Sequence, residues 1–190
     1  DETRGMRHRA GEEVGYVVTF LEMGARPGFP RPHVPAGPAS ALIGAERPPA
    51  WYFLGLYDAV GAGYEWTDQH ERPAEEVAAF LADPAVGLYT LIRAGWPHGF
   101  FVLDGRTPLT CDLAYFGLVP EAVGHGLGTF LLHTALHMAW DRPGTRKVTV
   151  NTNSLDHPRA LPLYQKAGFV PVRRESRTRV LRHDRDIIEA

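Results

Sequence analysis

The sequence VPEAVGHGLGTFLL (residues 119–132) joins a run of strand-forming residues to a helical pattern. Gly124, Gly126 and Gly128 alternate through a short loop. Apolar residues then recur with helical spacing, at Leu127, Phe130, Leu131, Ala135 and Met138. Backbone N–H groups in such a loop can approach an anion closely, and the first turn of a helix favours negative charge. The stretch therefore predicts a phosphate-binding loop at the start of a helix.

Two common nucleotide-binding loops do not fit these residues. A dinucleotide fingerprint reads G-x-G-x-x-G with an acidic residue about 20 positions further on, whereas residues 147–149, near that distance here, are Lys-Val-Thr. A Walker loop needs Gly-Lys-Ser/Thr, but Thr129 and Phe130 follow Gly128. Since glycine is also the ordinary breaker residue, a simple turn is the alternative.

Composition limits the class of protein. The chain has 190 residues, 44% of them hydrophobic, which suits one globular domain with a substantial core. The formal net charge of −2 gives no positive field that would favour nucleic acid or an anionic membrane. Cys111 is the only cysteine, which excludes an intrachain disulfide and favours a reducing compartment. Residues 1–5 lack the apolar core of a signal peptide, and no apolar run reaches membrane-spanning length. We expect a soluble, cytoplasmic protein that acts on small molecules.

The first half of the chain predicts a strand, a long loop and two helices. Residues 1–13 are polar and indicate a loosely ordered tail, and residues 14–23 are rich in β formers. Five prolines and three glycines fall within residues 24–38. This density excludes a helix or a central strand and predicts an ordered loop over a functional site. Helical patterns follow over residues 49–60 and 73–84.

The second half predicts the rest of a sheet. Three strand-like runs separated by turn signals indicate an antiparallel meander: residues 87–93, 99–103 and 109–119. After the glycine loop and its helix come a strand, a helix, a strand and a candidate further strand: residues 147–152, 158–166, 169 onward and 177–182. This order predicts an α/β (α+β) fold with a mixed, mostly antiparallel sheet of about six to seven strands flanked by helices. We expect it to form a single domain over residues 14–190.

Two tracts flank the glycine loop and occur in a recognisable order. The first is LAYFGLVPE (residues 113–121), followed by GLG (residues 126–128), and the second is ALPLYQKAGF (residues 160–169). Together they resemble the signature of the GNAT family of acyl-CoA-dependent N-acetyltransferases. The resemblance implies a sheet that splays between its fourth and fifth strands and holds the pantetheine arm of acetyl-CoA in the gap. It also implies acetyl-CoA as co-substrate.

The resemblance assigns coenzyme contacts to particular residues. It implies that backbone N–H groups of the loop bind the pyrophosphate: Gly124, His125, Gly126, Leu127, Gly128 and Thr129. It implies that Phe116 and Leu118, with Gly117 between them, pair with pantetheine, and that an N–H near Leu118 polarises the thioester carbonyl. Two positions depart from the family pattern. Val123 replaces the usual Gln or Arg, and His157 replaces the Asn three residues before Ala160, with Asn153 as the candidate substitute.

Acetylation of an amine needs charge stabilisation at the thioester carbonyl and a proton for the leaving thiolate. Tyr164 matches the family tyrosine beside the coenzyme sulfur, whose phenol can donate that proton, and packing is the alternative role. Asp112 aligns with a strand position where some members carry the base, and a structural carboxylate is the alternative. Strand alternation places Asp112, Ala114 and Phe116 on one face and Cys111 on the other.

Other reactive side chains favour structural roles. Cys111 could form an acyl-enzyme, but single buried cysteines are usually small core residues. His133 and His137 have the spacing of metal ligands on a helix. However, Thr134 takes the place of the glutamate in H-E-x-x-H, and no third ligand is evident. We expect solvated helix histidines and no metal.

The acceptor pocket is expected among aromatic and acidic residues between positions 51 and 68, which suit a cationic amine. The candidates are Trp51, Tyr52, Glu65 and Trp66, with core packing as the alternative. Six arginines also lie within residues 173–185. They would bind phosphate or an acidic substrate if they face the site, and a solvated edge strand is the alternative.

We therefore expect an enzyme that transfers an acetyl group directly from acetyl-CoA to a primary amine of a small molecule, in a ternary complex. An acyl-CoA-binding regulatory module without turnover is one alternative, and a protein or peptide acetyltransferase is another. The Pro-rich loop favours a covered pocket over an open peptide groove. A homodimer through the terminal strands is the candidate assembly.

Overall fold

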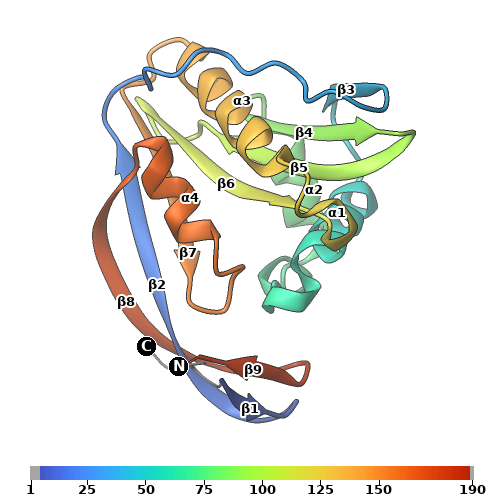
Figure 1. Cartoon of the computed structure of the whole chain (residues 1–190), viewed down its shortest axis with the longest axis vertical. Coiled ribbons are helices and arrows are strands. Elements are labelled where there is room, and N and C mark those ends of the chain that lie inside the picture. Colours follow the sequence, from blue (N-terminus) through green and yellow to red (C-terminus); the bar gives the residue numbers. More distant parts are fainter. Residues whose placement is uncertain (1–4, 189–190) are drawn as a thin grey trace.

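The computed structural model describes residues 5–188 and contains a seven-stranded sheet in the order β3-β4-β5-β6-β7-β2-β8 (Figure 1). Its strands are β2 (Glu13–Met23), β3 (Ser40–Ala45), β4 (Val86–Arg93), β5 (Trp96–Asp104), β6 (Thr110–Leu118), β7 (Lys147–Asn153) and β8 (Val170–Val180). A separate two-stranded sheet joins β1 (Met6–His8) to β9 (Arg185–Ile187). Every described pair is antiparallel except β6–β7, which confirms the predicted mixed sheet.

Helices cover both faces of this sheet. They are α1 (Ala50–Gly61), α2 (Ala74–Ala82), α3 (Leu127–Asp141) and α4 (Ala160–Ala167), with 3-10 turns η1 (Ala62–Tyr64), η2 (Asp68–Glu71) and η3 (Pro120–Ala122). Neighbouring strand residues point to opposite faces. Phe100 of β5 contacts Phe53 of α1, whereas a Cβ at Gly99 would lie 3.2 Å from Leu131 of α3. Helices α1 and α3 therefore pack on opposite faces of β5.

Strand β2, from the first part of the chain, lies between β7 and β8, which come from its last third. β2 pairs with β7 over Val18 to Met23 and with β8 over Glu13 to Glu22. Leu21 and Met23 are buried in the main core. A strand with neighbours on both edges suits the nearly continuous β-forming run of the sequence. Its place in the sheet depends on partners more than 100 residues away.

Three segments differ from the predictions. β1 lies within the expected loose tail, where Met6 to His8 pair with β9. β3 is an unpredicted strand that pairs with β4. β8 runs unbroken to Val180, so most of the candidate strand at residues 177–182 is the end of β8. A single domain over residues 14–190 stays a prediction. Among residues 5–188, none of the helices is long and apolar enough to cross a membrane.

The sheet opens between β6 and β7. These strands pair in parallel at only three positions, from Thr110 opposite Lys147 to Asp112 opposite Thr149. Beyond these pairs the two strands diverge (Figure 1). The sheet therefore has an open edge on the β6 side, and the glycine loop lies directly after that edge.

Candidate active site

A cavity of about 430 Å³ occupies the opening between β6 and β7. Its walls come from Leu113 to Leu118 of β6, the glycine loop, the end of β7 and helix α4. One end, which we call the acceptor end, is bounded by residues of α1, the segment after it, β6 and β8: Tyr57, Tyr64, Glu65, Trp66, Asp68, Tyr115 and Arg179. The cavity thus connects the glycine loop to a mainly aromatic enclosure.

The glycine loop has the backbone shape that an anion site requires. Gly124 and Gly126 have φ values of 93° and 73°, in the left-handed region that favours glycine. Gly126 is the N-cap of α3, and no side chain caps the helix. A Cβ at either glycine would meet no heavy atom within 4 Å, so there is open space beside the backbone. The uncapped N–H groups of α3 can therefore receive phosphate oxygens.

Strand β6 carries a bulge beside the opening. Val102 of β5 pairs with Tyr115, whereas Leu103 pairs with Leu113, so Ala114 is the extra residue. Such a bulge leaves one residue without a ladder partner and re-aims the side chains after it. The predicted alternation of faces from Asp112 to Phe116 therefore breaks at Ala114. Both Tyr115 and Phe116 line the cavity.

Tyr164 lies on the cavity wall and is 5% exposed. It belongs to α4, which ends at Gly168 with φ 113°, the predicted glycine cap. Its ring makes edge contacts with Phe116 and Phe169. Burial raises the pKa of the phenol, with smaller contributions from the charges of Asp156 and Asp112. The side chain is therefore a protonated donor at neutral pH.

Asp156 is a carboxylate that lines the same cavity as Tyr164, and sequence reasoning did not identify it. Its Oδ1 accepts a hydrogen bond from Trp66 Nε1 at 3.1 Å. Its Oδ2 accepts hydrogen bonds from Thr152 Oγ1 at 2.8 Å and from the Asn153 N–H at 2.9 Å. Since each carboxylate oxygen has about two lone-pair sites, Oδ1 can accept one more donor.

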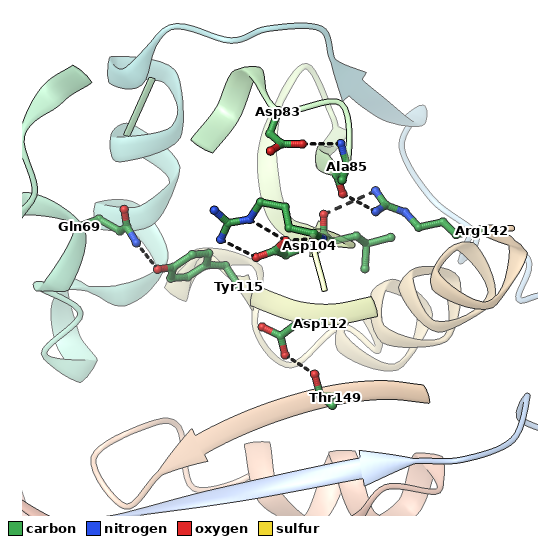
Figure 2. Close-up of polar contacts among 10 residues, drawn as sticks. Gln69, Asp83, Ala85, Asp104, Asp112, Tyr115, Arg142 and Thr149 are labelled. Carbon is green, nitrogen blue, oxygen red and sulfur yellow. Dashed lines mark hydrogen bonds and ion pairs between the residues drawn. The ribbon is translucent and has the colours of Figure 1, made fainter. Parts of the chain in front are cut away.

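The predicted base has a different environment. Asp112 does not line the cavity, and its Oδ1 accepts a hydrogen bond from Thr149 Oγ1 at 2.6 Å, where β6 and β7 are still paired (Figure 2). Burial raises the pKa of Asp112, and the hydrogen bond from Thr149 opposes this. Cys111 is completely buried, and burial raises its pKa to about 11, as expected for a core cysteine. This arrangement favours the structural alternative for Asp112.

The acceptor end is built from aromatic residues whose rings pack at an angle to one another and form hydrogen bonds. Gln69 Nε2 donates to Tyr115 Oη (Figure 2), and the Gln69 N–H donates to Tyr57 Oη at 3.4 Å. The Trp66 ring lies 5.5 Å from the Tyr57 ring and 5.9 Å from the Tyr115 ring, between centroids. Burial raises the pKa of both Tyr57 and Tyr115. These phenols therefore stay neutral.

Glu65 lines the cavity, but its carboxylate is hydrogen-bonded to the protein backbone. It is 2% exposed and has φ 63°, in the left-handed region. Its two carboxylate oxygens accept hydrogen bonds from the backbone N–H groups of Arg182 and His183, at 3.0 and 3.3 Å. Glu65 therefore holds the end of β8 against the segment after α1 and closes the acceptor end.

Two predicted acceptor residues lie elsewhere. Trp51 is 73% exposed, and Tyr52 Oη hydrogen-bonds to Thr90 Oγ1 of β4 at 2.9 Å. Neither lines the cavity, because the first turn of α1 lies away from it. Of the four predicted acceptor residues, Glu65 and Trp66 line the cavity, whereas Trp51 and Tyr52 lie away from it.

Most of the predicted coenzyme residues meet at the cavity. Its lining includes Phe116, Gly117, Leu118, Gly124, Gly126, Gly128, Thr129, Asn153, His157 and Ala160. His125 and Leu127 do not line it, and the Leu127 side chain is buried in the core. Asn153 Oδ1 accepts a hydrogen bond from the Leu155 N–H, and His157 Nδ1 accepts one from the Arg159 N–H. These bonds fix the turn before α4.

The Pro-rich segment, residues 24–38, covers helix α3 and not the cavity. Arg26 and Arg31 both form ion pairs with Asp141 at the end of α3. The Phe29 ring stacks on His133 at 3.7 Å, and His137 Nε2 donates to the Phe29 carbonyl at 2.9 Å. The segment contributes no cavity residue. The expectation of a loop over the site was wrong.

The two helix histidines hold this segment. His137 is 6% exposed, so it is a packed side chain and not the solvated one expected. Within residues 5–188, no group of three or more His, Cys, Asp or Glu side chains could hold a metal ion.

Sequence reasoning missed Tyr115, Asp156 and Arg179 as cavity residues. Tyr115 falls within the quoted tract, but its direction depends on the bulge at Ala114. Arg179 was one of six arginines with no sign of which faced the site. Asp156 could have been found from its position three residues after Asn153 and shortly before a helix. Asp residues in such turns often accept hydrogen bonds from backbone N–H groups.

Comparisons with known proteins agree with this site. The model of the Acetyltransferase (GNAT) family matches residues 53–169. Since this match covers more than half of the chain, the chain belongs to the GNAT family, whose chemistry is acyl-CoA-dependent acetyl transfer. A search of curated proteins finds no match.

Solved structures show the same fold at low identity. A tandem GNAT protein from the clavulanic acid biosynthesis pathway has 19% identity and a TM-score of 0.63, over 92% of this chain and 55% of that one. A GCN5-related N-acetyltransferase from Kribbella flavida has 19% identity and a TM-score of 0.56, over 86% and 59%. The aminoglycoside N-acetyltransferase AAC(6')-Iy in complex with CoA has 17% identity and a TM-score of 0.53, over 74% and 95%. The chain thus spans less than two thirds of several matched structures, at 55% to 63% of their length.

Proposed function

We propose that this protein is an N-acetyltransferase that moves the acetyl group of acetyl-CoA directly to a primary amine of a small molecule. The observation that carries the proposal is the continuous cavity from the uncapped start of α3, along the open edge of β6, to the aromatic acceptor end. Acetyl-CoA supplies the activated acetyl thioester when bound. Gly124, Gly126 and the first turn of α3 would hold its pyrophosphate, and Leu113 to Leu118 would line its pantetheine arm.

The residues of the chain have separate tasks in this proposal. Tyr164 keeps its proton at Oη, because burial raises its pKa, and would donate it to the thiolate of CoA as the C–S bond breaks. Asp156 would accept a hydrogen bond from the neutral amine at the free lone pair of Oδ1, orient the nucleophile, and take the proton that the nitrogen loses as the C–N bond forms. Trp66 keeps that carboxylate in place through its indole N–H. Asp112 has no part in this scheme, since its carboxylate lies outside the cavity.

A small acceptor is favoured because the acceptor end is closed by the C-terminal segment. Arg179 Nη2 donates to Thr67 Oγ1 at 2.6 Å, and the N–H groups of Arg182 and His183 donate to Glu65. An extended peptide would have to displace these contacts. A cytoplasmic location and a homodimer remain predictions.

The test is thermal unfolding with and without acetyl-CoA, followed in the same sample by thiol release with a panel of small amines and peptides. Coenzyme at about 100 times its dissociation constant should add about 2.7 kcal/mol, or roughly 5 to 10 °C at this chain length. Stabilisation with thiol release from a small amine supports the proposal. Stabilisation without release favours the regulatory alternative, and release only with peptides favours a protein acetyltransferase. No stabilisation at saturating coenzyme would refute the proposal.

A further inference from the structure

Unpaired buried polar atoms gather around the acceptor end. Within residues 5–188, four buried side-chain atoms have no hydrogen-bond partner: Gln69 Oε1, Arg179 Nε, Arg185 Nε and Arg185 Nη1. Arg179 lines the cavity, and Gln69 donates to the cavity residue Tyr115. Arg185 Nη2 donates to the carbonyl of Leu155 at 2.8 Å, and the next residue, Asp156, lines the cavity. Buried groups of this kind are rare in native proteins because each one costs free energy, and a missing ligand is one explanation.

Arg179 differs from the other arginines on the same face of β8. Arg173 and Arg177 both pair with Glu175, which lies between them. Arg179 has no carboxylate within 4.0 Å among the described residues, and its Nη2 donates only to the neutral hydroxyl of Thr67. Its guanidinium lies 5.7 Å from the Tyr16 ring centroid. One arginine of this strand therefore brings an unpaired positive charge to the cavity wall.

Two consecutive residues, Trp66 and Thr67, link the charge of Arg179 to the part of the cavity that holds Asp156 and Tyr164. Thr67 accepts the hydrogen bond from Arg179, and Trp66 donates to Asp156. Asp156 lies close enough to Tyr164 for its charge to raise the pKa of that phenol. A cation and the amine-orienting carboxylate thus bond to two consecutive residues, Thr67 and Trp66, and both charged groups line one cavity. An acceptor with an anionic group at one end and an amine at the other would meet both.

We propose that Arg179 binds a carboxylate of the acceptor, so that the substrate class is an amino acid or another small amine that carries a carboxylate. The inference rests on the proposed N-acetyltransferase function and names the acceptor of that same site. A planar guanidinium is suited to a carboxylate. A single-charged group is favoured over a phosphate dianion, because Asp68 and Asp156 also line the cavity and would repel a second negative charge.

The experiment compares the standard amino acids, each with its C-terminal carboxamide, which keeps the amine and side chain but removes the negative charge. Thiol release with acetyl-CoA gives kcat/KM for both members of each pair. Thermal unfolding of the protein saturated with CoA gives binding of both members without turnover. We expect at least one acid to be acetylated with kcat/KM about 10- to 100-fold above its amide, the range for a lost charge-assisted contact.

Arg179→Met should abolish this preference by raising KM for the acid about 10- to 100-fold more than KM for the amide. Arg179→Lys keeps the charge and should restore part of the preference. Arg177→Met is the matched control, because it removes an arginine from the same face of the same strand whose charge is already paired with Glu175. Thr67→Val removes the hydrogen bond to Arg179 without removing the cation, and it should keep a preference for the acid.

The outcomes separate the inference from the function on which it rests. Acetylation of acids and amides with equal kcat/KM, or a preference that survives in Arg179→Met, would overturn the inference and leave the N-acetyltransferase intact. Binding of acetyl-CoA without binding of any acid to the CoA-saturated protein would overturn the inference as well. If acetyl-CoA does not stabilise the protein, the proposed function fails first and the inference falls with it.

Discussion

Replacing Gly61 with alanine should displace the tryptophan that supports the acceptor end. Gly61 is the last residue of α1, and its φ of −102° is accessible to alanine. A Cβ at this position would lie 2.2 to 2.3 Å from three atoms of the Trp66 indole. Because carbon atoms in contact are about 3.5 to 4.0 Å apart, the indole must move by roughly 1.2 to 1.8 Å. The hydrogen bond of 3.1 Å from Trp66 Nε1 to Asp156 would then be lost.

The magnitude follows from three contributions. Overpacking costs about 1 to 3 kcal/mol, and the lost hydrogen bond to a carboxylate costs about 1.5 to 3 kcal/mol. Alanine gains up to about 1 kcal/mol over glycine in a helix, which offsets part of this. We expect Gly61→Ala to lower the free energy of unfolding by about 1.5 to 6 kcal/mol. Each kcal/mol should lower Tm by about 2 to 4 °C. We also expect KM for the acceptor to rise, while stabilisation by acetyl-CoA is retained.

The assay is thermal unfolding followed by tryptophan fluorescence, with steady-state kinetics on the folded protein. Gly55→Ala is the control, since Gly55 is an exposed residue of the same helix and a Cβ there would meet no atom within 4 Å. That variant should be more stable than the wild type by about 0.5 to 1 kcal/mol. If Gly61→Ala were as stable as Gly55→Ala, the close packing of Trp66 against α1 would be refuted.

The remaining predictions concern the donor, the glycine loop and the buried carboxylate. Tyr164→Phe should lower kcat by about 100-fold or more and leave the shift in Tm with acetyl-CoA unchanged; full turnover would exclude Tyr164 as the acid. Gly126→Ala and Gly144→Ala both place alanine in the left-handed region, at φ 73° and 81°, and each should cost about 1 to 2 kcal/mol. Only Gly126→Ala should also lose the stabilisation by acetyl-CoA, as measured by thermal unfolding. Burial raises the pKa of Asp112 in the folded state. The charged carboxylate therefore lowers the free energy of unfolding at pH values above its folded-state pKa, and this cost disappears below the unfolded pKa of about 3.9. Asp112→Asn should therefore raise Tm relative to the wild type at pH 8 more than at pH 4, with turnover retained; equal differences at both pH values would contradict the cost of burying this charge.

Local structure was predictable where neighbouring residues decide it. The glycine loop and the start of α3 depend on left-handed backbone angles and on apolar spacing within about 15 residues, and both follow from residues 119–138 alone. The three strands of the meander and the cap of α4 at Gly168 follow from turn and cap signals in the same way. Because the family signature lies in these local elements, the cavity walls formed by the end of β6 and the glycine loop were largely predictable too.

The acceptor half was decided by tertiary structure. Trp51 and Trp66 both lie near α1 in the sequence, yet only Trp66 reaches the cavity, because the chain turns after Gly61 and Trp66 donates to Asp156, which lies 90 residues further on. The bulge at Ala114 redirects Tyr115, and no local pattern announces a register shift against another strand. The pairing of β2 with both β7 and β8 sets the place of β8 in the sheet, where Arg179 lines the cavity while Arg173 and Arg177 pair with Glu175. The sequence by itself determined the glycine loop and the elements around it, because φ angles and helical periodicity are local properties. Only the tertiary structure decided which acids, arginines and aromatic rings face the acceptor, because those contacts join residues that are distant in the chain.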